Sequence, residues 1–191
     1  VWHLEDGFLR SLAKGRQHPP LVLLVDDLGV HFDATQPSRM EQRIQQPLTP
    51  AQHNRARELQ QRWCAQRLSK LNPARESPAP AEPFVLVVDQ SAGDCSIGLG
   101  QAGPESFRRM LQEALGDQPD CLVVVKVHPD VIRGRARGHF RRQDLQHPRI
   151  RICADGLHPA ALLEQAQAVY VVTSQMGFEA LLWGRTVHCF G

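Results

Sequence analysis

The stretch VVVKVHPDVIRGRARGHF (Val123–Phe140) joins an apolar run to a proline-containing turn and then to a segment rich in arginine. A short β-branched run that ends in polar side chains is typical of a buried strand in a parallel sheet. Parallel sheets bind ligands at the carboxyl ends of their strands, which is where Lys126 and His128 are expected to lie. The stretch therefore predicts an α/β fold with an anion site at this strand end.

Apolar runs alternate with helical patterns on both sides of this stretch. Strands are expected to begin at Phe84, Cys121, Ile150, Ala168 and Thr186. Helices are expected over residues 104–115, 160–166 and 176–183, with Gly116 and Gly184 placed to end two of them. This alternation predicts a parallel sheet that is covered by helices on both faces.

The chain before residue 73 is organised differently. Two extended runs are followed by two capping boxes, which pair Ser38 with Glu41 and Thr49 with Gln52. Apolar residues then recur at helical spacing, which predicts a packed amphipathic helix over residues 50–71.

The prolines of residues 73–83 indicate a linker, because this stretch has no apolar periodicity. It separates a partial N-terminal domain, residues 1–72, from an α/β domain, residues 84–191.

Composition and charge limit the possible functions. The 191 residues carry 22 basic and 20 acidic side chains, for a net charge of +2, so bulk charge does not favour nucleic-acid binding. The chain has no long apolar run and begins with charged residues, which predicts a cytoplasmic protein without a signal peptide. The five scattered cysteines form no CxxC pair, so we expect reduced, mostly packing residues and neither a zinc site nor a disulfide framework.

Polar residues mark two of the expected strand ends. Lys126 and His128, held by the turn at Pro129, suit a phosphate group, with Arg133, Arg135 and Arg137 as a second layer. The alternative is a capped strand end followed by a solvated basic loop.

The other polar strand end carries Thr173 and Ser174. Hydroxyls and free N–H groups at a helix start suit an anion, although Ser174 equally suits an ordinary N-cap. Glu179 lies one turn into an apolar helix, where a carboxylate needs a partner such as a ribose diol.

Three groups of carboxylates are candidates for acid/base or nucleophilic chemistry. Glu5 and Asp6 point to opposite faces of an extended chain, so only one of them can face a cleft, and a surface turn is the commoner explanation. Asp26 and Asp27 present the same ambiguity. Asp94 lies in a loop that contains GLGQAG, but these glycines stand too far from the preceding strand for a nicotinamide or flavin site.

Five segments together resemble one known family: LEDGFLRS, VDDLGVHFDATQPS, VLVVDQSAGDCSIGLGQAGPESF, VKVHPDVIRGRARGHF and VYVVTSQMGFEALLWG. In their order and spacing they are similar to the KpsC family of bacterial capsule polysaccharide proteins, which transfer β-linked Kdo, an acidic sugar, from CMP-Kdo. A more distant resemblance connects them to bacterial sialyltransferases. The resemblance implies a GT-B glycosyltransferase fold, with a Rossmann-like CMP-sugar domain at 84–191 and part of the acceptor-side domain at 1–72.

The resemblance also assigns roles to particular residues. It places Asp94 as the nucleophile of a retaining double displacement, and Glu5 and Asp6 as the acid/base group. It implies phosphate contacts and a ribose contact from Lys126, His128, Pro129, Thr173, Ser174 and Glu179. No cofactor and no metal is implied beyond the donor substrate.

The implied partners are CMP-Kdo, a lipid-linked Kdo acceptor on the inner face of the inner membrane, and other capsule assembly proteins, but no nucleic acid. The chain resembles the first of two transferase modules and is expected to be truncated at both ends, so that it could bind donor without turnover. Two alternatives are a UDP-sugar epimerase-like enzyme and a non-enzymatic module whose basic loop binds lipid head groups or RNA.

Overall fold

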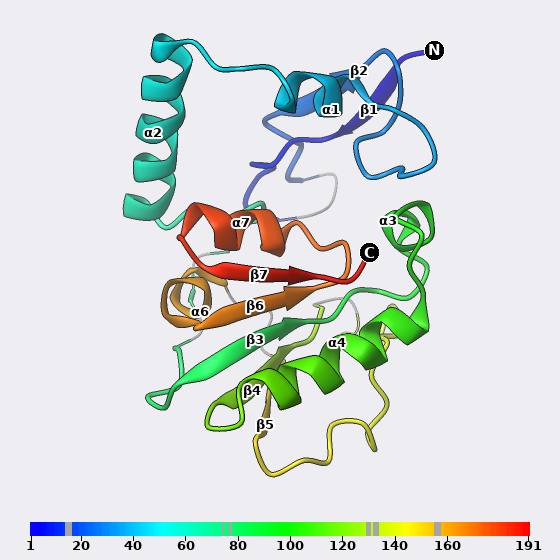
Figure 1. The fold of residues 1–191 in the computed structure, drawn as a ribbon, viewed down its shortest axis with the longest axis vertical. Coiled ribbons are helices and arrows are strands. Elements are labelled where there is room, and N and C mark those ends of the chain that lie inside the picture. The colour runs from blue at the N-terminus through cyan, green and yellow to red at the C-terminus, as the bar shows by residue number, and fades with distance from the viewer. Residues whose placement is uncertain (14–16, 74, 77, 129–130, 132–133, 155–157) are drawn as a thin grey trace. The chain divides into compact units, whose positions relative to one another are not determined.

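A computed structural model of the chain describes residues 1–13, 17–73, 75–76, 78–128, 131, 134–154 and 158–191. It contains two compact units, Val1–Ala74 and Arg75–Gly191 (Figure 1). The boundary between them falls inside the proline-rich stretch 73–83.

The second unit is built on a five-stranded sheet in the order β5-β4-β3-β6-β7. Its strands are β3 (Phe84–Val88), β4 (Leu122–Lys126), β5 (Ile150–Cys153), β6 (Ala168–Val171) and β7 (Thr186–Cys189). Every neighbouring pair is parallel, which confirms the predicted α/β class. All residues of the central strand β3 are buried, as expected for a strand covered on both faces.

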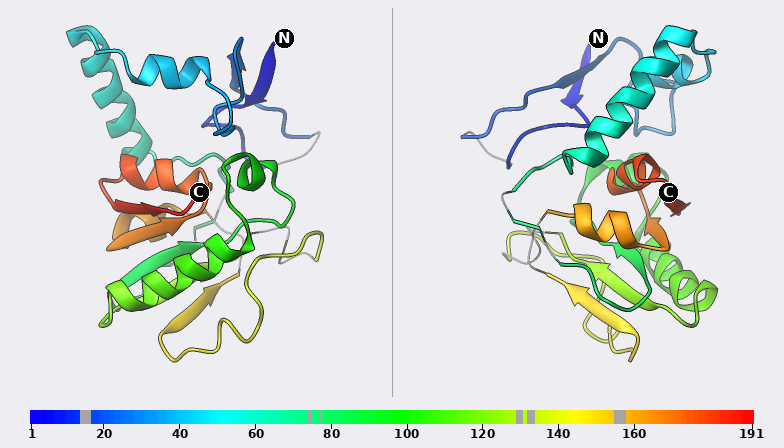
Figure 2. Two further views of the ribbon diagram at one scale, coloured as in Figure 1. Left: turned by 45° about the vertical axis from the view of Figure 1, so that its right-hand side comes forward. Right: turned by 90° about the vertical axis from the view of Figure 1, so that its left-hand side faces the viewer.

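Helices cover both faces of this sheet (Figure 2). On one face Phe107 and Met110 of α4 (Pro104–Asp117) pack against the side chains of β3 and β4 that include Val87. On the other, α6 (Ala160–Gln165) and α7 (Met176–Leu182) cover a cluster that includes Leu86. Full burial of one such side chain stabilises the fold by about 1.5–3 kcal/mol. The successive residues Leu86 and Val87 therefore anchor β3 to both helix layers.

Two details of this unit differ from the sequence-based expectations. Gly116 does not end α4, because glycine only permits a helix to stop and the chain continues in helical geometry to Asp117. The glycine-rich loop contains an unpredicted short helix, α3 (Cys95–Leu99). Gly184 does follow α7, with a φ of 69° that glycine adopts readily.

The first unit contains a two-stranded antiparallel sheet, formed by β1 (His3–Asp6) and β2 (Leu23–Asp26). Both predicted capping boxes are present, at the starts of α1 (Arg39–Ile44) and α2 (Pro50–Ala65). These caps form because each needs only residues that lie within one helical turn.

The predicted packing and length of α2 were wrong. The helix ends at Ala65 rather than residue 71, since Arg67 adopts a positive φ of 52° and turns the chain. No residue of α2 is buried, and Leu59 is 53% exposed. The long polar side chains around the helix leave only a narrow apolar stripe, which is too small to hold it against a core.

The five cysteines are all free, and three of them are at least partly buried, in line with the expectation of mostly packing residues. Cys95 and Cys189 are exposed, whereas Cys121 is buried and the remaining two are partly buried.

Candidate functional site

The loop after β3 connects polar residues from three strand ends. Ser91 Oγ lies 3.0 Å from Nδ1 of His128, which follows β4. Gln90 Nε2 donates to Oγ1 of Thr173, which follows β6, over 3.0 Å, and Gln90 Oε1 accepts from the Thr173 N–H over 3.0 Å. Because β3 lies between β4 and β6, one loop contacts both neighbours. His128 and Thr173 therefore belong to one polar edge of the sheet, where a parallel sheet binds ligands.

Asp94 lies on the same loop and caps α3. Its Oδ1 accepts hydrogen bonds from the N–H of Ser96 at 3.0 Å and from Ser96 Oγ at 2.8 Å. Ser96 Oγ is also 2.9 Å from Thr173 Oγ1, so Asp94 is tied to the polar edge through a hydroxyl. Asp94 is exposed, and its Oδ2 makes no hydrogen bond to any other residue that the structure describes. One carboxylate oxygen is thus positioned while the other faces solvent.

Ser174 lies just before α7, and the sequence left open whether it is the N-cap of this helix. Its Oγ accepts a hydrogen bond from the N–H of Met176 at 3.3 Å. The N-cap position itself belongs to Gln175, whose side chain makes no capping bond. Ser174 is therefore not the N-cap, although its hydroxyl satisfies one of the free N–H groups at the helix start.

Two of the predicted ligand contacts are deeply buried. Lys126 is 7% exposed, and Glu179 is 1% exposed with its Oε1 accepting from Gln175 Nε2 at 3.4 Å. Their contacts with phosphate and ribose stay predictions, and each would require local opening around the side chain. Pro129 and Arg133 lie outside the described residues.

Asp89 received no role from the sequence, yet it is a central residue of this edge. It is 4% exposed and its Oδ1 accepts from the N–H groups of Gln90 at 2.9 Å and His139 at 3.1 Å. Burial raises the pKa of Asp89 to about 6, against the opposing effect of these two hydrogen bonds. Its signal in the sequence is a carboxylate placed directly after a wholly apolar strand.

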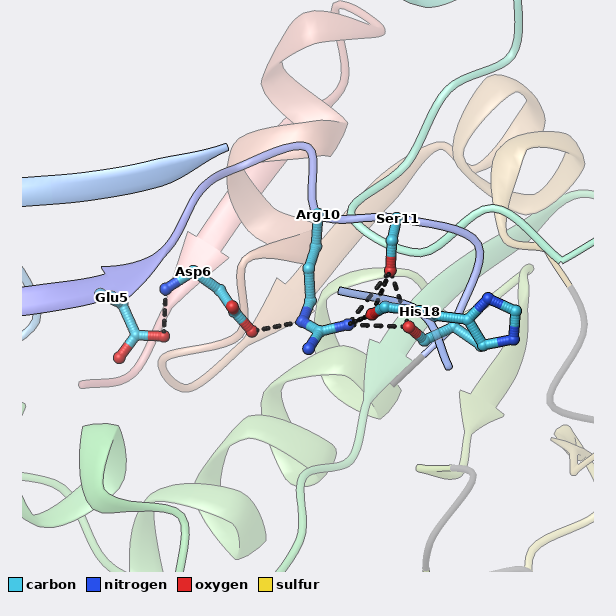
Figure 3. A network of polar contacts seen from close by, with 6 residues as sticks. Glu5, Asp6, Arg10, Ser11 and His18 are labelled. Atoms are coloured by element: carbon cyan, nitrogen blue, oxygen red, sulfur yellow. Dashed lines mark hydrogen bonds and ion pairs between the residues drawn. The ribbon is translucent and has the colours of Figure 1, made fainter. Parts of the chain in front are cut away.

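In the first unit the structure distinguishes the two adjacent carboxylates. Figure 3 shows that Asp6 points toward Arg10, whose Nε donates to Asp6 Oδ2 over 2.6 Å. Arg10 Nη1 in turn donates to the carbonyl groups of Ala13 and His18, at 2.7 and 3.0 Å. Asp6 is thus part of a network that holds the following segment in place.

Glu5 lies on the other face of β1 and lines a cavity of about 740 Å³. Burial lowers the pKa of His31, another residue of the cavity wall, and the negative charge of Glu5 partly opposes this effect. The polar and aromatic residues of the wall also include Trp2, His3, Asp26, Asp27, Arg39 and Arg43. Of Glu5 and Asp6, Glu5 is therefore the carboxylate that can contact a molecule bound in this cavity.

The other two acidic candidates of this unit have structural partners. Desolvation raises the pKa of Asp26, but backbone N–H donors at Leu28, Arg39, Gly29 and Met40 together lower it to about 2. Asp27 forms an ion pair with Arg39, with a distance of 2.8 Å between Oδ2 and Nη2. Asp26 thus accepts the N–H groups of Arg39 and Met40 in the first turn of α1, beside the capping box at Ser38, and Asp27 holds the first arginine of that helix.

The ranges that the structure describes contain neither a metal-binding cluster nor a membrane-spanning helix. Within them, no three His, Cys, Asp or Glu side chains cluster in a way that could hold a metal ion. Within the same ranges, no helix is both long enough and apolar enough to cross a membrane.

Comparison with solved structures supports the resemblance seen in the sequence. The chain superimposes on the β-Kdo 2,4 transferase of Thermosulfurimonas dismutans KpsC with a TM-score of 0.89 and 39% identity, over 98% of this chain and 60% of that one. The β-Kdo 2,7 transferase of the same KpsC gives a TM-score of 0.73 and 27% identity, over 99% of this chain and 56% of that one. These matches confirm the expected GT-B class of α/β fold.

Comparison with curated sequences identifies relatives in capsule and lipopolysaccharide biology. The chain is 41% identical to the capsule polysaccharide modification protein LipA of Neisseria meningitidis serogroup A, over 98% of this chain and 28% of LipA. It is 34% identical to the lipopolysaccharide-processing protein LpsZ of Rhizobium meliloti, over 100% of this chain and 45% of LpsZ. The chain thus spans less than half the length of both relatives.

A family model described as "Capsule polysaccharide biosynthesis protein" matches residues 1–72 and 52–191. Because these matches extend along the whole chain, the chain belongs to the capsule polysaccharide biosynthesis protein family.

Proposed function

We propose that the chain forms part of a retaining glycosyltransferase that moves β-Kdo from CMP-Kdo to a lipid-linked Kdo acceptor during capsule polysaccharide synthesis. The observation that carries this proposal is the polar edge after β3, where one loop places Asp94 and links the residues that follow β4 and β6. The Kdo transferases among the structural neighbours support the same reaction class.

Asp94 is the proposed nucleophile. Its solvent-facing Oδ2 would attack the anomeric carbon of Kdo while the bond from that carbon to the phosphate oxygen breaks and CMP leaves with the electron pair. An acceptor hydroxyl would then displace Asp94 from the same carbon. Two inversions give net retention, by the logic that applies to retaining glycosidases.

His128 is the proposed partner of the departing phosphate. Its contact with Ser91 fixes the orientation of the ring, and a ring N–H donor positioned in advance stabilises the negative charge that develops on CMP. Thr173 and Ser174 would add hydroxyl and N–H donors from the neighbouring strand end. These donors allow phosphate departure with side-chain and backbone groups of this chain.

Glu5 is the proposed acid/base group that takes the proton of the acceptor hydroxyl. It lines the cavity of the first unit, whereas Asp6 is committed to Arg10. A proton acceptor must be able to meet its substrate, which favours Glu5 over its neighbour.

The comparison with the two solved Kdo transferases also favours one linkage position in the product. The β-Kdo 2,4 transferase matches the chain with a higher TM-score and identity than the β-Kdo 2,7 transferase. We therefore expect a 2,4-linked product, made on the cytoplasmic side of the inner membrane. Linkage analysis of the product by nuclear magnetic resonance distinguishes the two positions.

Thermal denaturation in the presence of nucleotides tests the donor class. A ligand that binds only the folded protein raises its Tm, so CMP should stabilise the protein and UDP should not. His128→Ala should reduce the shift caused by CMP. Stabilisation by UDP alone would instead indicate the epimerase-like class.

A further inference from the structure

The basic segment that follows β4 is docked on the loop that carries Asp94. The N–H of Ala92 donates to the carbonyl oxygen of Arg137 over 2.6 Å, and the N–H of His139 donates to Asp89 Oδ1 over 3.1 Å. Gly138, between these two contacts, lies so close to Asp89 that a Cβ on it would overlap Asp89 Oδ2. The backbone of residues 137–139 is therefore fixed beside the loop rather than free in solvent.

The ring of His139 strengthens this attachment. It stacks on Phe107 of α4, with ring centroids 3.7 Å apart and an interplanar angle of 2°. Burial lowers the pKa of His139, while its hydrogen bond to the backbone of Ser91 and the charge of Asp94 oppose that shift. His139 therefore holds the segment in place by stacking on Phe107, and its ring lies within electrostatic reach of Asp94.

Arg137 is the cation that this attachment presents next to the Asp94 loop. Its side chain is exposed, and among the residues that the structure describes its guanidinium has no ion pair or hydrogen bond. Three arginines elsewhere in the chain show the contrast. Arg10 forms an ion pair with Asp6, and Arg39 forms one with Asp27. Arg149 donates hydrogen bonds to the carbonyl groups of Gln118 and Cys121. An arginine whose backbone is held in place, and whose guanidinium makes no ion pair or hydrogen bond with the described residues, is well suited to bind an anionic group of a ligand.

The chemistry of the donor requires a cation near Asp94. The anomeric carbon of Kdo carries a carboxylate, so attack by Asp94 brings two negative charges close together. A guanidinium beside them offsets this repulsion and binds a carboxylate through two parallel hydrogen bonds. The hydrogen bond from the N–H of Ala92 to the carbonyl oxygen of Arg137 holds the backbone of Arg137 beside the loop in which Asp94 follows Ala92 by two residues.

We propose that Arg137 binds the carboxylate of the acidic donor sugar and so determines specificity for CMP-activated acidic sugars. This inference rests on the proposed function, because it concerns the same donor site. It assigns part of the basic segment to substrate recognition rather than to solvent.

Binding of two probes to the full-length protein tests this assignment by isothermal titration calorimetry. One probe is CMP, and the other is a CMP-Kdo analogue fluorinated next to the anomeric carbon, where fluorine slows departure of CMP. Arg137→Ala should leave the Kd for CMP within about twofold and weaken binding of the fluorinated analogue by about tenfold or more. Arg137→Lys should weaken binding of the fluorinated analogue to an intermediate degree. Lysine keeps the positive charge but lacks the two parallel N–H donors of the guanidinium group.

Arg142→Ala is the matched control, since it removes an exposed arginine of the same segment and should change neither Kd. Arg137 meets its neighbours through its backbone carbonyl, so the alanine variant should keep the wild-type Tm. An equal loss for both probes would place Arg137 at the phosphate and overturn the assignment, as would no loss for either. Failure of the wild-type protein to bind CMP at all would instead overturn the proposed donor class.

Discussion

Gly138 packs directly on the carboxylate of Asp89, although the two residues belong to segments that follow different strands. The same carboxylate accepts the N–H of His139, so a side chain and a glycine together attach the basic segment to the loop after β3. Close backbone approach of this kind is a reason for glycine at a position with ordinary backbone geometry.

Gly138→Ala should therefore destabilise the protein. The added Cβ forces a buried carboxylate or the segment 137–139 to move, which should lower the free energy of unfolding by about 1–3 kcal/mol. Gly116→Ala is the control, because a Cβ there meets nothing within 4 Å and the residue lies in helix α4. The control should stabilise the protein by up to about 1 kcal/mol. Urea denaturation measures both, and equal stability of the two variants would contradict the packing argument.

Stability should depend on pH through Asp89. Its pKa is raised from 3.8 to about 6 in the folded protein, so the folded state binds the proton more tightly than the unfolded state. The contribution to stability is fully present below pH 3.8 and is lost as the pH rises through 6, by at most about 3 kcal/mol. Asp89→Asn should remove this component, so the difference in unfolding free energy between wild type and variant should change between pH 4 and 7. A difference independent of pH would show that the carboxyl titrates normally.

Asp94→Asn should abolish formation of a covalent sugar adduct without unfolding the protein. The amide oxygen can still accept from the Ser96 N–H, so the cap of α3 survives and the change in stability should be below about 1 kcal/mol. Mass spectrometry after incubation with CMP-Kdo should find Kdo on the peptide that contains Asp94 of the wild type. Asp120→Asn, which removes another exposed carboxylate, should leave the adduct intact. An adduct on a different carboxylate would reassign the nucleophile.

Glu5→Gln and Asp6→Asn should have opposite profiles. Glu5→Gln removes the proposed proton acceptor, so kcat should fall by about 100-fold or more while Tm stays close to wild type. Asp6→Asn removes the ion pair with Arg10, so it should lower the free energy of unfolding by up to about 1 kcal/mol. Its kcat should fall less than that of Glu5→Gln. Steady-state kinetics and thermal denaturation of the two variants, compared side by side, test this division. Equal losses of kcat would show that both carboxylates act in the reaction.

Local features of the sequence predicted much of the fold. The capping boxes at Ser38 and Thr49 formed as expected, and the apolar runs became the parallel strands. These predictions succeed because a cap involves neighbours within one turn, and because burial on both faces of a strand requires an unbroken apolar run. The prediction that α2 packs against a core was wrong, because helical spacing of a few apolar residues does not specify what covers them.

The sequence by itself determined which residue types follow each strand, and hence that the carboxyl edge of the sheet is polar. Only the tertiary structure decided which of them meet: Gln90 bonds Thr173 across 83 residues of chain, and Ser91 bonds His128 across 37. It also decided that Glu5 rather than Asp6 faces a cavity. The physical reason is that hydrogen bonds and ion pairs depend on distances in space, which the pairing order of the strands sets and which no local periodicity contains.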